Sequence, residues 1–203
     1  MSHSRLYKSI LNHIIELIKN KAIPHDVIQY IDFNYDEPYR GMETDETRFN
    51  DCVLNEEAEK VIASTGATIT HEYGERAGYL RRTDEIILPL TMQFNGRSDL
   101  YYTYVFSALA HWTGAPNRLN REQGDRGYQD YELGAQDHQR EAIIADLSAA
   151  FSLTTLGFSK AICANIAVHI EQNLHNLGQD HQFLETLLPP AQAATAYIFS
   201  FSS

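Results

Sequence analysis

The chain has 203 residues, 43% of them hydrophobic, which suits one globular domain of ordinary size with a true apolar core. No apolar stretch approaches the roughly 20 residues that span a bilayer, and residues 1–5 lack the pattern of a secretory signal, so we expect no membrane partner. The two cysteines, Cys52 and Cys163, are far apart and have no metal-ligand spacing. This favours a reducing cytoplasmic location and excludes a fold stapled by several disulfides.

The formal net charge of −11 is unevenly distributed. Between residues 32 and 60, ten acidic side chains stand against three basic ones, a local net charge of −7. An acidic surface repels a phosphate backbone, so broad electrostatic binding of nucleic acid is disfavoured. The segment suits a basic partner surface, or it is a solvated face that keeps the protein soluble. The sequence leaves both interpretations open.

The first part of the chain predicts one helix and a connector. Apolar residues at helical spacing predict a helix over residues 6–24, closed by Pro24. Residues 25–54 are acidic and poorly patterned, and we interpret them as a connector. Asn55 is placed to cap a short helix that runs through Ser64. Three strand-like runs follow at 67–72, 77–82 and 85–88, and the turn residues between them predict an antiparallel β-meander.

The remainder of the chain is predicted to be helical. Ser98 is expected to cap a helix that ends near residue 112, and residues 113–136 form a loop rich in Gly, Asn and Asp. A long helix over 137–156 closes at Gly157. Two more helices are expected at 160–177 and 181–199, the last one broken or kinked by Pro189 and Pro190. These elements predict an α+β fold with a small antiparallel sheet and a helical C-terminal half.

Residues 107–121 contain half of a metalloprotease motif. In a His-Glu-x-x-His helix, two imidazoles one turn apart bind one zinc ion, and the glutamate is the general base. Here His111 is the second histidine, whereas Ser107 and Ala108 stand where the first histidine and the glutamate would be. The run His-Trp-Thr-Gly-x-Pro-x-Arg-Leu-x-Arg, from His111 to Arg121, resembles the zincin-like metallopeptidase domain of ArdC-type antirestriction proteins, which mobile elements carry.

The resemblance covers residues 55–200 well and residues 5–41 loosely. It implies a zincin-like domain at 55–203, preceded at 1–54 by the remnant of a single-stranded-DNA-binding region. In the family, the third zinc ligand is a glutamate on the following helix, and that position aligns with Ala142. Asp146 aligns with a residue that supports a zinc-binding histidine. Glu141 is retained but lies about 100° round the helix from Ala142, so we expect it to point elsewhere.

The resemblance thus implies a degenerate site with no metal cofactor and no catalysis by the family mechanism. One imidazole does not hold zinc usefully, because affinity comes from several ligands acting together. We expect His111 to hydrogen-bond Asp146 or to pack as a neutral imidazole. The alternative is a rebuilt zinc site in which His138 and Glu141, three residues apart on one helix face, join His111. Against it stands the ordinary case of two surface residues.

Basic and aromatic side chains form one further candidate surface. Together they suit single-stranded nucleic acid, and the candidates for such a binding face are Arg81, Arg82, Arg118, Arg121 and Tyr128. The alternative is that these arginines pair with the abundant acidic side chains.

The sequence therefore predicts a catalytically inactive zincin-like protein of a mobile element that acts by binding, as an antirestriction or anti-defence factor. A host defence protein or another protein partner is favoured, and single-stranded DNA is the other candidate. The competing hypothesis is a zinc metallopeptidase with recruited ligands, and zinc is a cofactor only in that case.

Overall fold

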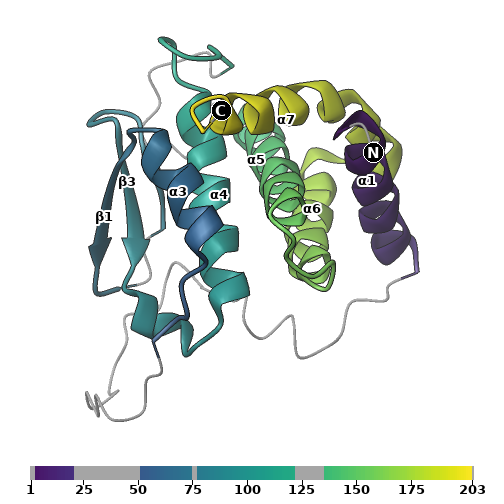
Figure 1. Cartoon of the computed structure of the whole chain (residues 1–203). Coiled ribbons are helices and arrows are strands. Elements are labelled where there is room, and N and C mark those ends of the chain that lie inside the picture. Colours follow the sequence, from purple (N-terminus) through teal and green to yellow (C-terminus); the bar gives the residue numbers. More distant parts are fainter. Residues whose placement is uncertain (1–2, 21–50, 75–76, 122–134, 203) are drawn as a thin grey trace.

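The computed structural model of the chain describes residues 3–20, 51–74, 77–121 and 135–202. Figure 1 shows the small sheet at one end of the molecule, helix α1 at the other end, and the long helices between them. The elements in chain order are α1 (His3–Lys19), α3 (Glu56–Ser64), β1 (Thr68–Glu72), β2 (Gly78–Leu80), β3 (Glu85–Pro89), η2 (Thr91–Phe94), α4 (Ser98–Thr113), α5 (Ala135–Thr155), α6 (Ile162–Leu177), η3 (His181–Phe183) and α7 (Leu184–Phe199). This order confirms the predicted α+β class.

The three strands form a mixed sheet in the order β1–β3–β2. β2 and β3 are antiparallel, with Leu80 opposite Glu85, so the predicted hairpin between them is confirmed. β1 instead pairs with β3 in the parallel sense, from Thr68 opposite Glu85 to Glu72 opposite Pro89. The predicted β-meander, and with it the purely antiparallel sheet, is therefore wrong in the placement of β1.

Burial explains this strand order. β3 has the sequence Glu-Ile-Ile-Leu-Pro, and its residues from Ile86 to Pro89 are all buried. A strand that is apolar on both faces is most stable in the middle of a sheet. β1, with the sequence Thr-Ile-Thr-His-Glu, is largely exposed and suits an edge. Turn residues predict pairing between neighbours in the chain, and they carry no information about which strand is the most buried.

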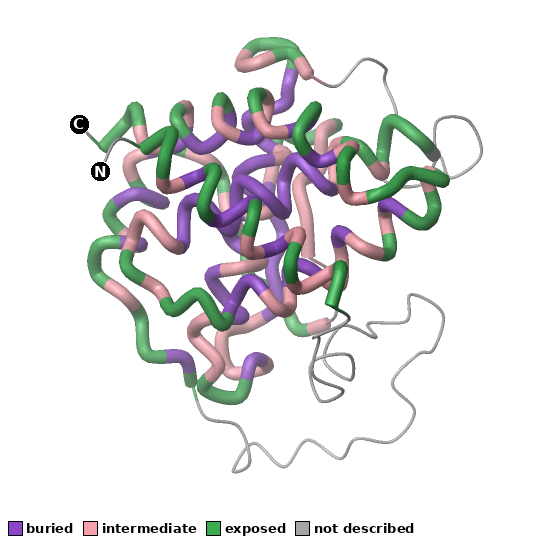
Figure 2. The backbone as a smooth tube through the Cα atoms, turned by 90° about the vertical axis from the view of Figure 1, so that its right-hand side faces the viewer, coloured by how far each residue is buried: buried purple, intermediate pink, exposed green. Residues whose placement is uncertain are grey.

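α5 is the central helix of the helical half. Every residue from Ile143 to Leu153 is buried, because α4, α6, α7 and α1 all pack against this helix. Figure 2 shows the buried backbone gathered in the middle of the molecule. A helix buried on all sides needs apolar or small side chains, and Asp146 is the one ionisable exception in this run. No helix of the described ranges, α5 included, is long and apolar enough to cross a membrane.

α1 contributes to the same core as the C-terminal helices. Ile10, Leu11 and Ile14 are fully buried, and the ring of Tyr7 stacks on Phe151 of α5 with 4.7 Å between the ring centroids. The helix ends before the predicted boundary at residue 24, and residues 21–50, which hold most of the predicted connector, lie outside the described residues. The division of the chain at residue 54 stays a prediction.

The local signals at helix ends have mixed outcomes. The side chain of Asn55 accepts a hydrogen bond from the first turn of α3, which confirms the predicted cap. Gly157 follows α5 with a φ of +81°, as expected for a glycine that closes a helix. Ser98 is the first residue of α4 rather than its cap. α7 runs on through Pro189 and Pro190, so these prolines do not end the helix.

Candidate functional site

The candidate site lies where α4 packs against α5. Ser107 and His111 are one helical turn apart on α4, so their side chains leave the same face of the helix. Ser107 hydrogen-bonds Asp146 of α5, and His111 approaches Glu141, one to two turns earlier on that helix. The two helices therefore run antiparallel at this point. Small side chains let three helices approach closely here: Ala110 of α4, Ala145 of α5 and Ala194 of α7 form a fully buried cluster.

Asp146 is a buried carboxyl group bonded to the hydroxyl of Ser107. The residue is 6% exposed. Loss of solvation raises the pKa of Asp146 to about 8, and the hydrogen bond with Ser107 opposes this rise. The carboxyl group is therefore mainly protonated at neutral pH. The first of the two arrangements predicted for His111, a hydrogen bond to Asp146, is not found. Ser107, at the position of the missing histidine, makes this contact instead.

His111 packs as a neutral imidazole, which was the second of the two predicted arrangements. Its Nδ1 lies 3.8 Å from Oε1 of Glu141, beyond hydrogen-bonding distance. Burial, together with the positive charges of His138 and Arg121, lowers the pKa of His111 to about 3. Its side chain is 23% exposed, yet the surrounding protein solvates an imidazolium poorly. No ion pair with Glu141 forms near neutral pH.

Glu141 lies beside His111 rather than pointing elsewhere, and Arg121 holds it there. The guanidinium of Arg121 donates to Oε1 and Oε2 of Glu141 at 2.6 and 3.3 Å. It also donates to Oγ1 of Thr113 at 2.8 Å and to the carbonyl of Ala110 at 2.7 Å. Burial raises the pKa of Glu141 and Arg121 lowers it. The two-pronged contact favours the ionised pair, so Glu141 is engaged in joining α5 to the end of α4.

Gly114 of the sequence motif lies directly against this pair. A Cβ atom added at Gly114 would lie 3.1 Å from Oε1 of Glu141 and 3.2 Å from Nη2 of Arg121. Both contacts are tighter than ordinary van der Waals distances, so the ends of the Glu141 and Arg121 side chains would have to shift by a few tenths of an ångström to admit a Cβ atom. The Thr-Gly step of the motif is thus explained by packing.

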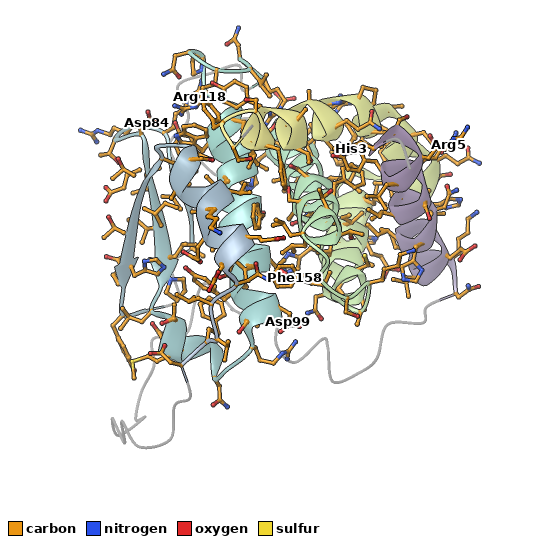
Figure 3. All side chains as sticks on the ribbon, viewed as in Figure 1. His3, Arg5, Asp84, Asp99, Arg118 and Phe158 are labelled. Atoms are coloured by element: carbon orange, nitrogen blue, oxygen red, sulfur yellow. The ribbon has the colours of Figure 1, made fainter. Side chains whose placement is uncertain are left out.

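Arg118 fastens the β2–β3 hairpin to the C-terminal end of α4. Its guanidinium lies 4.1 Å from the centroid of the Trp112 ring, and it donates to the Trp112 carbonyl and to the Tyr79 hydroxyl, the latter at 2.9 Å. It also bonds both carboxylate oxygens of Asp84 and lowers the pKa of that residue. Figure 3 shows Arg118 and Asp84 at the same end of the molecule. The Arg118 side chain is only 6% exposed.

We expect Arg118→Ala to lower the free energy of unfolding by about 2–3 kcal/mol, because it removes several charge-assisted hydrogen bonds and a cation–π contact. Trp112 is the single tryptophan, so its fluorescence during urea unfolding reports on this contact directly. Arg82→Ala is the matched control, since Arg82 is exposed in the same hairpin turn. Its effect should stay within about 0.5 kcal/mol. Similar losses for both variants would contradict the role of Arg118.

The arginines of the predicted binding face differ in their surroundings. Arg118 and Arg121 are occupied by acceptors of their own chain, as in the alternative that we left open. Arg81 is half-buried and Arg82 is exposed, both in the β2–β3 turn, and Tyr128 lies outside the described residues. The two arginines of the sequence motif therefore serve the fold.

A second polar network joins α3, β1 and α4, and no sequence motif indicated it. The hydroxyl of Tyr102 accepts from the backbone of Asn55 at 2.7 Å and donates to Oε1 of Glu59 at 2.8 Å. Nε2 of His71 lies 3.1 Å from the hydroxyl of Tyr101. Burial raises the pKa of Tyr101 to about 12. The only signal was a pair of adjacent tyrosines in an apolar helix, which equally suits simple core packing.

The residues where α4 packs against α5 do not fit a catalytic zinc ion, which takes three protein ligands and a water molecule. Of the three ligand positions that the resemblance implies, only His111 carries a ligand, since positions 107 and 142 hold serine and alanine. Glu141 is bound by Arg121, and His138 is exposed in the first turn of α5. Within the described ranges, no three His, Cys, Asp or Glu side chains are grouped so that they could hold a metal ion.

Comparisons with known proteins place this site in context. The model of a family described as zincin-like metallopeptidase matches residues 56–186. Two Escherichia coli proteins named DNA primase TraC are 45% and 44% identical over 85 residues, which are 40% of this chain but only 6% and 8% of the primases. The structure is similar to the antirestriction protein ArdC of plasmid R388. The Mn(II)-bound form has a TM-score of 0.56 at 23% identity, over 77% of this chain and 56% of ArdC. The metal-free form has a TM-score of 0.54 at 23% identity, over 76% of this chain and 53% of ArdC.

Proposed function

The chain belongs to the zincin-like metallopeptidase family, and from this premise we propose that it is a catalytically inactive member, carried by a mobile element, that acts by binding as an antirestriction or anti-defence factor. The resemblance to ArdC-type proteins stated from the sequence is confirmed by the family match and by the fold of ArdC. The chain spans about half the length of ArdC and a small fraction of TraC. The activities of those whole proteins therefore enter only as part of this proposal.

One observation carries the proposed inactivity: serine and alanine stand at three of the family's ligand and base positions, which are 107, 108 and 142. The neighbouring acidic side chains bond other groups, because Asp146 bonds Ser107 and Glu141 bonds Arg121. With one imidazole at the α4–α5 contact, there are too few donors to bind a metal ion firmly. With alanine at position 108, the carboxylate that would serve as the family's general base is missing. The domain would therefore act through its surface, by binding a partner.

A protein partner is favoured over single-stranded DNA. The chain carries a net charge of −11, and a nucleic acid backbone is repelled by such a field. Arg118 and Arg121, the most suggestive basic residues of the sequence, are nearly buried and occupied. A gel-shift experiment with single-stranded DNA over a range of salt concentrations tests this preference, since tight and strongly salt-dependent binding would favour DNA instead.

The proposed function is tested in a bacterial host with a restriction system. Expression of the chain should raise the transformation efficiency of unmodified plasmid DNA, and should have no effect in a host that lacks the restriction system. His111→Ala should protect within about twofold of the wild type, because protection by binding does not need the imidazole. If the folded variant lost protection, or if the purified protein held close to one zinc ion per chain, the metallopeptidase alternative would replace this proposal.

A further inference from the structure

Within the described residues, β1 presents a sheet edge that no other strand occupies. It pairs with β3 on one side, and among the described strands none pairs with its other side. The carbonyl of Glu72 accepts from the backbone of Leu90, which continues β3. Because the backbone groups of successive strand residues point to alternate sides, the N–H and C=O groups of Ile69 and His71 point outward. Figure 1 shows β1 as the outermost strand, on the side of the sheet away from α4.

β1 lacks three of the features that usually protect such an edge. Natural edge strands are blunted by lysine, by proline or by a β-bulge. The strand Thr-Ile-Thr-His-Glu contains no lysine or proline, and its register with β3 is continuous. Four of its five residues are exposed. Tyr73, directly after the strand, is 61% exposed. An exposed strand with an aromatic side chain at its end is suited to the addition of a further strand.

The charges around β1 favour a basic occupant. The three strands contain Glu72 and Glu85 and no lysine or arginine. Glu85 lies beside Thr70, whose hydroxyl donates to it. Glu59 of α3 adds negative charge close to His71. A second copy of this chain would bring the same carboxylates and its own net charge of −11 to the edge, so charge disfavours pairing of β1 with itself.

We propose that β1 binds an extended, basic segment of a partner protein as an additional strand. The backbone groups of Ile69 and His71 would bond the segment, and Glu72 and Glu85 would pair with its lysine or arginine side chains. The inference rests on the proposed function for the existence of a protein partner, and it places the docking surface away from the α4–α5 contact.

The probe is a fluorescent peptide with four lysines alternating with three valines, titrated with the full chain and followed by fluorescence polarisation. Binding should saturate and should weaken as salt is added. Glu72→Lys should weaken it by about fivefold or more, since it turns attraction into repulsion. Glu57→Lys is the matched control, because Glu57 is an exposed acid on α3, and its effect should stay below about twofold. A peptide of the same sequence with every amide N-methylated keeps its charges but should not bind.

Amide hydrogen exchange locates the contact. The outward amides of Ile69 and His71 should exchange fast in the free protein and become protected when the peptide is added. Absence of binding, binding of the N-methylated peptide, or equal weakening by Glu72→Lys and Glu57→Lys would overturn the inference. Protection of the same amides without peptide, in a protein with the mass of a dimer, would assign the edge to a second copy and would also overturn it.

The restriction experiment separates this inference from the proposed function. If the wild type protects DNA in the restricting host and Glu72→Lys protects equally well, the docking surface is wrong and the proposed function stands. If the wild type does not protect but the peptide results hold, the proposed function fails and the strand-binding edge remains.

Discussion

The combined substitutions Ser107→His and Ala142→Glu are expected to raise the affinity for zinc by at least about a thousandfold, because they would bring the number of ligands from one to three. The antiparallel contact of α4 and α5 provides the geometry. Position 107 is one turn before His111, and position 142 is one turn before Asp146. Since Asp146 contacts Ser107, position 142 should face His111. The three donors would then converge between the helices.

The surroundings of the rebuilt site favour binding. His111 is neutral, with a pKa of about 3, so no proton has to leave it. Asp146 is placed to accept a hydrogen bond from a new imidazole at position 107, an arrangement that orients zinc-binding histidines. Titration calorimetry with zinc, and the absorption spectrum of the cobalt form, would measure the affinity and the tetrahedral geometry. Ser107→His with Ala142→Gln is the control, because an amide is a much weaker ligand. Equal affinities for both double variants would mean that position 142 does not face His111.

The helices and their ends were predictable where the controlling interactions are local. The carboxamide oxygen of Asn55 accepts a hydrogen bond from the backbone of Ala58 in the first turn of α3. Both partners of this bond lie within four adjacent residues. The β2–β3 hairpin has its turn between strands that are neighbours in the chain. In both cases, a window of several residues contains both partners, so a pattern in the sequence is enough.

The partners of the charged residues between α4 and α5 were not predictable in the same way. Glu141 was expected to point elsewhere because its Cα lies about 100° from position 142 on the helix. Its side chain is long enough to reach Arg121, which arrives from the loop after α4. Ser107 and Asp146 likewise meet only because α4 and α5 are antiparallel. The motif indicated which residue types are present, but the approach of the two helices decides which of them bond.

The placement of β1 has the same physical origin. Thr68, Thr70 and Glu72 alternate with Ile69 and His71, a pattern that predicts a strand with one solvent-exposed face, and the structure contains this strand. Its choice of β3 as a partner depends on the burial of Ile86 and Leu88 against the helices. Parallel pairing of this kind needs a connection longer than a tight turn, so the turn residues at 73 and 74 gave no information about the partner.

The stability of the protein is expected to fall as the pH rises from about 7 to 8, by roughly 1 kcal/mol, because Asp146 must lose a proton in a site that solvates the carboxylate poorly. The folded pKa of Asp146, about 8, is above its ordinary value of 3.8. The folded state therefore binds more protons than the unfolded state between these values. The stabilisation is complete below pH 3.8 and is lost as the pH rises through 8.

Asp146→Asn should remove this dependence and stabilise the protein at pH 8, because the amide has no proton to lose and can still bond Ser107. Below the ordinary histidine pKa of 6.5, His111 contributes the opposite slope, since its folded pKa is lowered to about 3. Chemical unfolding at several values between pH 7 and pH 8 thus isolates Asp146 from His111. Asp137→Asn is the control, because Asp137 is exposed in the first turn of the same helix, and it should leave the slope of the wild type unchanged. A slope that persists in Asp146→Asn would mean that another group titrates with folding, and that the Asp146–Ser107 contact holds an ionised carboxylate.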